Sequence, residues 1–176
     1  MKNEVNYKII KAIKSFKILI NVINPLENEN DIIEIITKLI SNEWYTQKIT
    51  AISLISIIIP FVSSENKNLL THYIVKLSDD DNSYVKKELC SNLKVKFNFN
   101  KDFFGLIEDK IYISLIQKYL KDENDNIKLY IIDNLIVIKN KDLTILSGSI
   151  INIIKEIANN DLWKVRITFA DKINEV

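Results

Sequence analysis

Residues that interrupt helices are scarce in this sequence. Its 176 residues include two glycines, Gly105 and Gly148, and two prolines, Pro25 and Pro60. Doubly wound α/β folds and β-barrels need glycine-bearing turns every ten or so residues. We therefore predict an all-α protein in which long helices are joined by short polar loops.

Cysteine and net charge are also low. One cysteine, Cys90, excludes an internal disulfide framework and fits a reducing compartment. The formal charge of +1 gives no reason to expect nucleic acid or an anionic membrane as a partner. Lysines interrupt the N-terminus, so no signal peptide is predicted, and the apolar run 51–62 is too short to span a bilayer. These features predict a protein of the cytoplasm or the nucleus.

Motifs that carry chemistry are missing as well. There is no Gly-rich phosphate loop and no metal-ligand spacing, and His72 and Cys90 are single and unclustered. The acidic run Asp79–Asp81 lacks the other ligands of a calcium loop and favours a solvated turn. We predict a protein that is not an enzyme, with no catalytic residue, no cofactor and no metal.

What the sequence does contain is a repeat. The segments "NEWYTQKITAISLI", "DDNSYVKKELCSNL", "ENDNIKLYIIDNLI" and "DLWKVRITFADKI" align on a basic residue, called the anchor below. The anchors are spaced by 38, 42 and 38 residues, and an acidic residue stands five positions before each. The anchors are Lys48, Lys86, Lys128 and Arg166, and the acids are Glu43, Asp81, Glu123 and Asp161.

Apolar residues follow each anchor segment at helical intervals of four, four and three. This spacing places them on one stripe of a helix, which we expect to be buried. The stripes are Ala51, Ile55 and Ile58; Val85, Leu89, Leu93 and Phe97; Ile127, Ile131, Leu135 and Ile138; and Val165, Phe169, Ile173 and Val176.

A second apolar helix is predicted before each of these, over 31–40, 65–77, 108–120 and 149–158. Helix, acidic turn and helix at a period near 40 is the layout of HEAT or armadillo repeats. A further helix over 7–20 resembles the second helix of an earlier repeat. We expect one array over 1–176, divided as 1–24, 25–62, 63–99, 100–140 and 141–176, with the last stripe predicting another repeat beyond it.

The charges of the turns also have a predicted role. We expect each acid to accept hydrogen bonds from free N–H groups at the start of the second helix, where the helix dipole also favours it. Each anchor is expected to pair with the acidic turn of its own or the adjacent repeat. Exposed pairs of this kind stabilise a protein by only about 0–1 kcal/mol. The isoleucine-rich interfaces should therefore supply most of the stability.

The stretches "NEWYTQKITAISLISIIIPFVSS", "LSDDDNSYVKKELCSNL", "LKDENDNIKLYIIDNL" and "DLWKVRITFADKINEV" resemble HEAT repeats of the scaffold (A) subunit of protein phosphatase type 2A. The resemblance covers about residues 5 to 176. It implies an α-α superhelix that scaffolds the phosphatase and binds regulatory B subunits through its intra-repeat turns. A catalytic subunit is expected only if C-terminal repeats, absent here, are present.

Partner-binding residues carried over from the resemblance lie in the turns. Two departures bear on them: Lys86 and Lys87 replace the family's usual arginine pair, and Ser83 stands where proline is common. Lysine cannot make the same bidentate contact with a carboxylate. The implied residues are Trp44, Tyr45, Lys48, Asp80, Asp81, Ser83, Lys86, Lys87, Asp122, Glu123, Trp163, Lys164 and Arg166.

Other interpretations remain open at this stage. Trp44 and Trp163 fit packing between repeats as well as partner binding. A generic HEAT-repeat adaptor or transport-receptor fragment with another protein partner is the main alternative function. Some HEAT-like proteins excise damaged DNA bases, but they need a strongly basic face and a catalytic carboxylate, which this sequence does not suggest.

Overall fold

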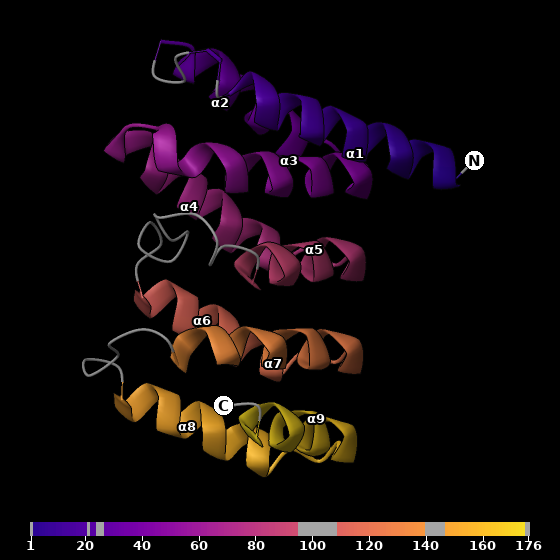
Figure 1. The fold of residues 1–176 in the computed structure, drawn as a ribbon, viewed down its shortest axis with the longest axis vertical. Coiled ribbons are helices and arrows are strands. Elements are labelled where there is room, and N and C mark those ends of the chain that lie inside the picture. Colours follow the sequence, from indigo (N-terminus) through magenta and orange to yellow (C-terminus); the bar gives the residue numbers. More distant parts are fainter. Residues whose placement is uncertain (1, 21, 24–26, 95–108, 140–146, 175–176) are drawn as a thin grey trace. The chain divides into compact units, whose positions relative to one another are not determined.

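The computed structural model describes residues 2–20, 22–23, 27–94, 109–139 and 147–174. Within these ranges the chain forms α-helices and one 3₁₀ turn, with no strand (Figure 1). No helix in the described part of the chain has the length and hydropathy needed to cross a membrane. The helices are α1 (Lys2–Leu19), α2 (Glu29–Ile40), α3 (Tyr45–Ile58), α4 (Ser64–Ser78), α5 (Ser83–Lys94), α6 (Asp109–Leu120), α7 (Asp125–Lys139), α8 (Ser147–Ala158) and α9 (Trp163–Asn174).

The helices fall where the apolar periodicity predicts them, to within a few residues. Most are 12 to 15 residues long, and α2 and α3, α4 and α5, α6 and α7, and α8 and α9 are each separated by a short turn. Pro60 closes the α3 segment in the 3₁₀ turn Ile59–Phe61, because proline has no N–H to continue a helix. The next helix starts with a cap, since the Ser63 hydroxyl accepts a hydrogen bond from the Asn66 backbone N–H at 3.4 Å.

The contacts divide the chain into two compact units, unit 1 (Met1–Asn92) and unit 2 (Leu93–Val176), each described here by itself. In unit 1, α3 contacts α1, α2 and α4, and α2 also contacts α4. Side chains are buried nearly all round α3, as expected for a helix with several neighbours. The core of unit 1 includes Ile36, Ile52, Ile55, Ile58, Leu70 and Ile74.

Unit 2 repeats this pattern of contacts. The helix α6 contacts α7 and α8, and α9 contacts α7 and α8. First helices of successive pairs are therefore neighbours, and so are second helices. The core of this unit contains Ile116, Tyr119, Ile127, Ile131, Ile153, Ile157 and Val165.

The predicted apolar stripes are confirmed wherever their side chains are described. The buried members are Ala51, Ile55, Ile58, Val85, Leu89, Ile127, Ile131, Val165 and Phe169. The side chains of Leu93, Phe97, Leu135, Ile138, Ile173 and Val176 lie outside the described residues.

The division into repeats stays a prediction. Of its boundaries, the one between Val62 and Ser63 falls between α3 and α4, while those at 24/25, 99/100 and 140/141 lie outside the described ranges. The contact of α1 with α3 resembles that of α7 with α9, and it supports the assignment of α1 as a second helix.

Candidate partner-binding surface

The four turns between the helices of each pair share one geometry, built from the residue six positions before the anchor. At this place, called position −6, an Asn or Asp side chain accepts a hydrogen bond from the backbone N–H two residues later. Such Asx turns are a local way to reverse the chain before a helix. The bonds are Asn42 to Trp44 at 3.0 Å, Asp80 to Asn82 at 2.9 Å, Asp122 to Asn124 at 2.8 Å and Asn160 to Leu162 at 3.0 Å.

The first turn of each second helix is also the same. One carbonyl accepts from the residue before the anchor at 2.9–3.0 Å and from the anchor itself at 3.3–3.4 Å. The accepting carbonyls belong to Trp44, Asn82, Asn124 and Leu162. The register aligned on Lys48, Lys86, Lys128 and Arg166 is therefore confirmed at the level of the backbone.

The predicted role of the acids at position −5 is wrong in one respect. Glu43, Asp81, Glu123 and Asp161 are all exposed, and within the described residues their carboxylates accept no hydrogen bond from the helix starts. The physical reason is the course of the turn, because the side chain at −6 reaches the N–H of the residue just before the helix. In α5 and α7 the helix start is instead capped by Asn82 and Asn124, which accept from the N–H groups of Tyr84 at 2.9 Å and Asn126 at 3.0 Å. The acids are left free to face solvent.

The predicted pairing of an anchor with an acidic turn is found for Lys48. The Lys48 ammonium lies 2.6 Å from the Asp80 carboxylate, which joins the α2–α3 turn to the α4–α5 turn. These side chains are only 23% and 10% exposed. Lys128 instead pairs with Asp125 in the first turn of its own helix, α7, at 3.0 Å. The next turn in unit 2 offers Lys128 no acid at position −6, because Asn160 stands there.

Arg166 uses a third arrangement. Its guanidinium donates to the backbone carbonyls of Asn160 at 2.5 Å and Asp161 at 3.1 Å, so it closes its own turn. A guanidinium has five N–H donors, and the side chain is exposed. Beside it, Trp163 is 55% exposed and the Lys164 ammonium lies 6.0 Å from the centre of its ring. Three of the predicted residues thus share one basic and aromatic surface in unit 2.

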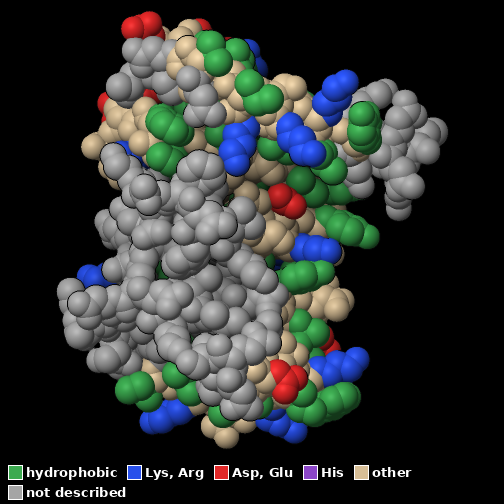
Figure 2. Space-filling view, in the orientation of Figure 1, with side chains coloured by type: hydrophobic (Ala, Val, Ile, Leu, Met, Phe, Trp, Pro, Cys, Tyr) green, Lys and Arg blue, Asp and Glu red, His purple; other side chains and the backbone are tan. Residues whose placement is uncertain are grey.

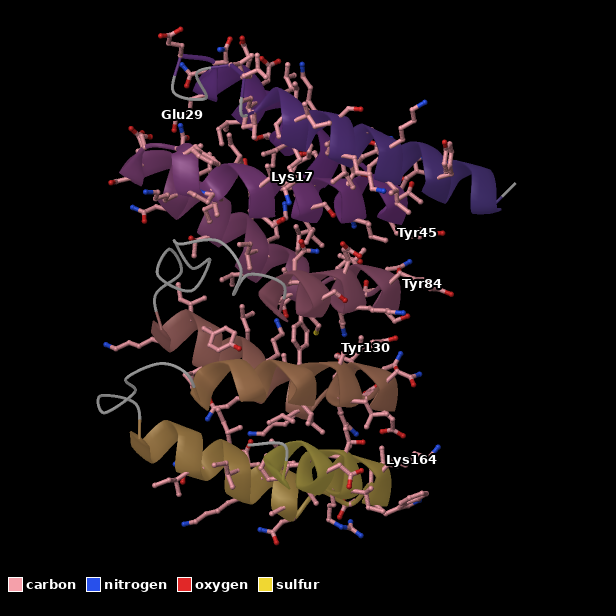
Figure 3. The ribbon with its side chains drawn as sticks, in the orientation of Figure 1. Lys17, Glu29, Tyr45, Tyr84, Tyr130 and Lys164 are labelled. Atoms are coloured by element: carbon pink, nitrogen blue, oxygen red, sulfur yellow. The ribbon has the colours of Figure 1, made fainter. Side chains whose placement is uncertain are left out.

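Aromatic side chains gather at the corresponding place in unit 1. Tyr45 and Tyr84 stack with ring centres 5.7 Å apart and planes inclined by 30°, and both labelled rings lie where α3 and α5 begin (Figure 3). Trp44 is 69% exposed and Tyr84 is 60% exposed. Hydrophobic side chains protrude from the surface at this edge (Figure 2). We call Trp44, Tyr45 and Tyr84 the aromatic patch.

A polar cleft of about 430 Å³ lies between the α2–α3 and α4–α5 turns of unit 1. The Lys48–Asp80 pair is part of its wall, and the two exposed acids Glu43 and Asp81 also line it. The remaining lining residues are Ile40, Lys76, Leu77, Asp79 and Asn82.

The other predicted residues lie near these turns. Ser83 is the first residue of α5 and is half-buried, as is Lys86, while Lys87 is exposed. In unit 2, Asp122 forms the Asx turn before α7 and Glu123 is exposed beside it. The contacts in unit 1 connect Lys48 with Asp80, and the partner-binding role of the whole set stays a prediction.

Some important residues were missed by the sequence analysis. Asn42 and Asn160 recur in register with Asp80 and Asp122, so the shared Asn/Asp at position −6 was a signal that could have found them. Tyr84 had no such signal, because its partner Tyr45 is distant in the sequence.

Glu29 was also missed, and it joins α2 to the start of α4 (Figure 3). One of its oxygens accepts from the Ser63 backbone N–H at 2.7 Å, the Ser63 hydroxyl at 2.8 Å and the Asn66 amide at 2.7 Å. Partial burial raises the pKa of Glu29, but the hydrogen bonds from Asn66 and Ser63, with the charge of Lys67, outweigh this and hold the pKa below its ordinary value.

Groups of metal-binding side chains are not found among the described residues, where His72 is exposed and Cys90 is buried and forms no disulfide. Single residues of this kind do not form a metal site.

A known protein is similar to this chain over most of its length. No family model matches it. The sequence is homologous to the A-type regulatory subunit of protein phosphatase PP2A from Saccharomyces cerevisiae, with 28% identity over 178 residues, covering 94% of this chain and 27% of that protein. The chain therefore spans about a quarter of the length of this curated relative. The predicted resemblance and the all-α, HEAT-type fold class are confirmed, as distant homology to a segment.

Proposed function

We propose that this chain is a non-catalytic scaffold of a protein phosphatase type 2A complex, and that it binds a regulatory B subunit through its intra-repeat turns. The observation that carries the proposal is the homology to the A-type regulatory subunit over 94% of the chain. No cofactor takes part in this function. The protein acts in the cytoplasm or the nucleus.

The chemistry of the turns supports a protein partner. Trp44, Tyr84 and Trp163 are large aromatic side chains that extend into solvent at the start of second helices. Tryptophan, tyrosine and arginine are the residues that most often dominate the binding energy of protein interfaces. Arg166 adds such a side chain next to Trp163 in unit 2.

The catalytic subunit is not assigned to this chain alone. The segment corresponds to 27% of the length of its relative, and the repeats implied to hold a catalytic subunit are C-terminal ones. We expect a catalytic subunit to bind only where C-terminal repeats are also present.

Binding of the full 176-residue chain to an immobilised B-type regulatory subunit tests the proposal. We expect the wild type to bind, and the double variant Trp163→Ala with Arg166→Ala to bind at least about tenfold more weakly, as for the loss of an interface hot spot. The matched control is Lys110→Ala, an exposed basic residue in the first turn of α6, at the opposite end of that helix from the α6–α7 turn. Circular dichroism checks that each variant keeps its helices.

Two results would count against the proposal. One is no detectable association of the wild type, and the other is undiminished association of the double variant. Capture of a partner outside the phosphatase would instead favour the generic adaptor.

A further inference from the structure

The aromatic patch of unit 1 has two acidic residues near it in the sequence, and their charge bears on which partner it can bind. Glu43 precedes Trp44 directly, and Asp81 lies three residues before Tyr84. Within the described residues both acids are exposed and accept no hydrogen bond from the helix starts, and it is Asn82 that accepts the Tyr84 N–H of α5. Two carboxylates that do not cap the helices therefore lie within three residues, along the sequence, of the three aromatic side chains.

The stacked rings bring these groups onto one surface. The contact of Tyr45 with Tyr84 places the α2–α3 and α4–α5 turns side by side, and Glu43 and Asp81 line the same cleft. One lysine of the cleft, Lys48, is neutralised by Asp80 at 2.6 Å. The lining of the cleft contains four carboxylates and two lysines, so its balance is acidic.

We propose that the aromatic patch, with Glu43 and Asp81, docks an arginine side chain of the partner protein. This inference rests on the proposed function, and it specifies the partner at the unit 1 turns. A guanidinium stacks on aromatic faces and donates paired hydrogen bonds to a carboxylate, which are the two kinds of group that meet here. A lysine ammonium cannot make the paired contact.

The second tryptophan provides a contrast within the same chain. Trp163 already has the Lys164 ammonium 6.0 Å from its ring centre and Arg166 on the same turn. A further cation would be repelled there. An arginine ligand should therefore affect Trp44 and leave Trp163 unchanged.

Titration of the ¹⁵N-labelled chain with a short glycine–serine peptide that carries arginines tests the inference, with the two indole N–H signals as reporters. We expect the Trp44 signal to shift and the Trp163 signal to stay. The double variant Glu43→Gln with Asp81→Asn, and separately Tyr84→Leu, should each weaken binding by about fivefold. Glu65→Gln, which neutralises an exposed acid on α4, is the control and should bind as the wild type does.

Three outcomes would overturn the inference. They are equal binding of a peptide with neutral citrulline in place of arginine, tighter binding of an acidic peptide, and movement of both indole signals together. The proposed function is tested separately with the B-type subunit. If that subunit binds the wild type and the Glu43→Gln with Asp81→Asn variant equally, the arginine site is wrong while the scaffold function stands.

Discussion

Asp80 has two separate roles, each carried by one of its oxygens. Oδ1 accepts the Asn82 backbone N–H and shapes its own turn, while Oδ2 pairs with Lys48 of the preceding turn. Because the ion pair is largely shielded from solvent, removing one partner leaves the other charge poorly solvated and should cost more than breaking an exposed pair. Asp80 thus stabilises its own turn and also connects that turn to the start of α3.

Substitutions at Asp80 should separate these roles. Asp80→Asn keeps an acceptor for the Asn82 N–H but removes the charge, and we expect a loss of about 1 kcal/mol in the free energy of unfolding. Asp80→Ala removes both and should cost about 1 kcal/mol more. Urea unfolding followed by circular dichroism measures both values. Glu34→Gln, which breaks the exposed Glu34–Lys38 pair, is the control and should have little effect. Equal losses for the two Asp80 variants would contradict the separation.

Glu29 should make stability depend on pH. Although partial burial raises its pKa, the hydrogen bonds from Asn66 and Ser63 lower the pKa in the folded protein below the ordinary 4.5. A lowered folded pKa means that the carboxylate stabilises the fold above the unfolded pKa, and that this contribution is lost as the pH falls through the folded value. The difference in urea midpoint between wild type and Glu29→Gln should therefore shrink from about pH 7 to about pH 3. A difference that is constant with pH would rule out this role.

At the scale of elements, the turn and the start of the following helix behave as one unit that occurs four times. Each combines an Asx turn at position −6 with the same first helical hydrogen bonds. The sequence predicted the register of these units, because the anchor, the acid and the apolar stripe recur at fixed local spacing. It did not predict which polar side chain makes the hydrogen bond. That choice depends on the backbone path through the turn, which places the side chain at position −6, and not the one at position −5, next to the N–H of the residue before the helix.

The turn geometry gives a direct test of that correction. Asn42→Ala removes the bond to the N–H of Trp44, the residue before α3, and should lower stability by about 1 kcal/mol, as for the loss of one hydrogen bond. Glu43→Ala, the adjacent change, should alter stability little because the Glu43 side chain is exposed. Thermal unfolding of both variants measures the contrast. A larger loss of stability for Glu43→Ala than for Asn42→Ala would mean that Glu43 caps α3 after all.

At the scale of the molecule, each unit has an isoleucine-rich core. Ile36 in unit 1 and Ile131 in unit 2 are completely buried. Helical repeats contact only their neighbours, so stability is approximately a sum of local terms. A defect in one core should therefore be felt mainly in its own unit.

Cavity variants test how far a defect spreads. Ile36→Ala and Ile131→Ala should each lower the stability of their unit by about 2–5 kcal/mol. Hydrogen exchange read by mass spectrometry should show faster exchange in α2 and α3 for the first variant, and in α6, α7 and α9 for the second. Equal acceleration throughout the chain for either variant would contradict the local summation and indicate one cooperative block.

The all-α class, the positions of the helices and their buried stripes could be inferred from the amino-acid order, because periodicity, scarce helix breakers and turn chemistry act over a few residues. Contacts between distant residues could not. The stacking of Tyr45 on Tyr84, the pairing of Lys48 with Asp80 and the anchoring of Ser63 by Glu29 each depend on two segments more than thirty residues apart coming together. Only packing of the helices brings such side chains within a few ångströms of each other. The surface proposed here for a partner's arginine exists because of those contacts.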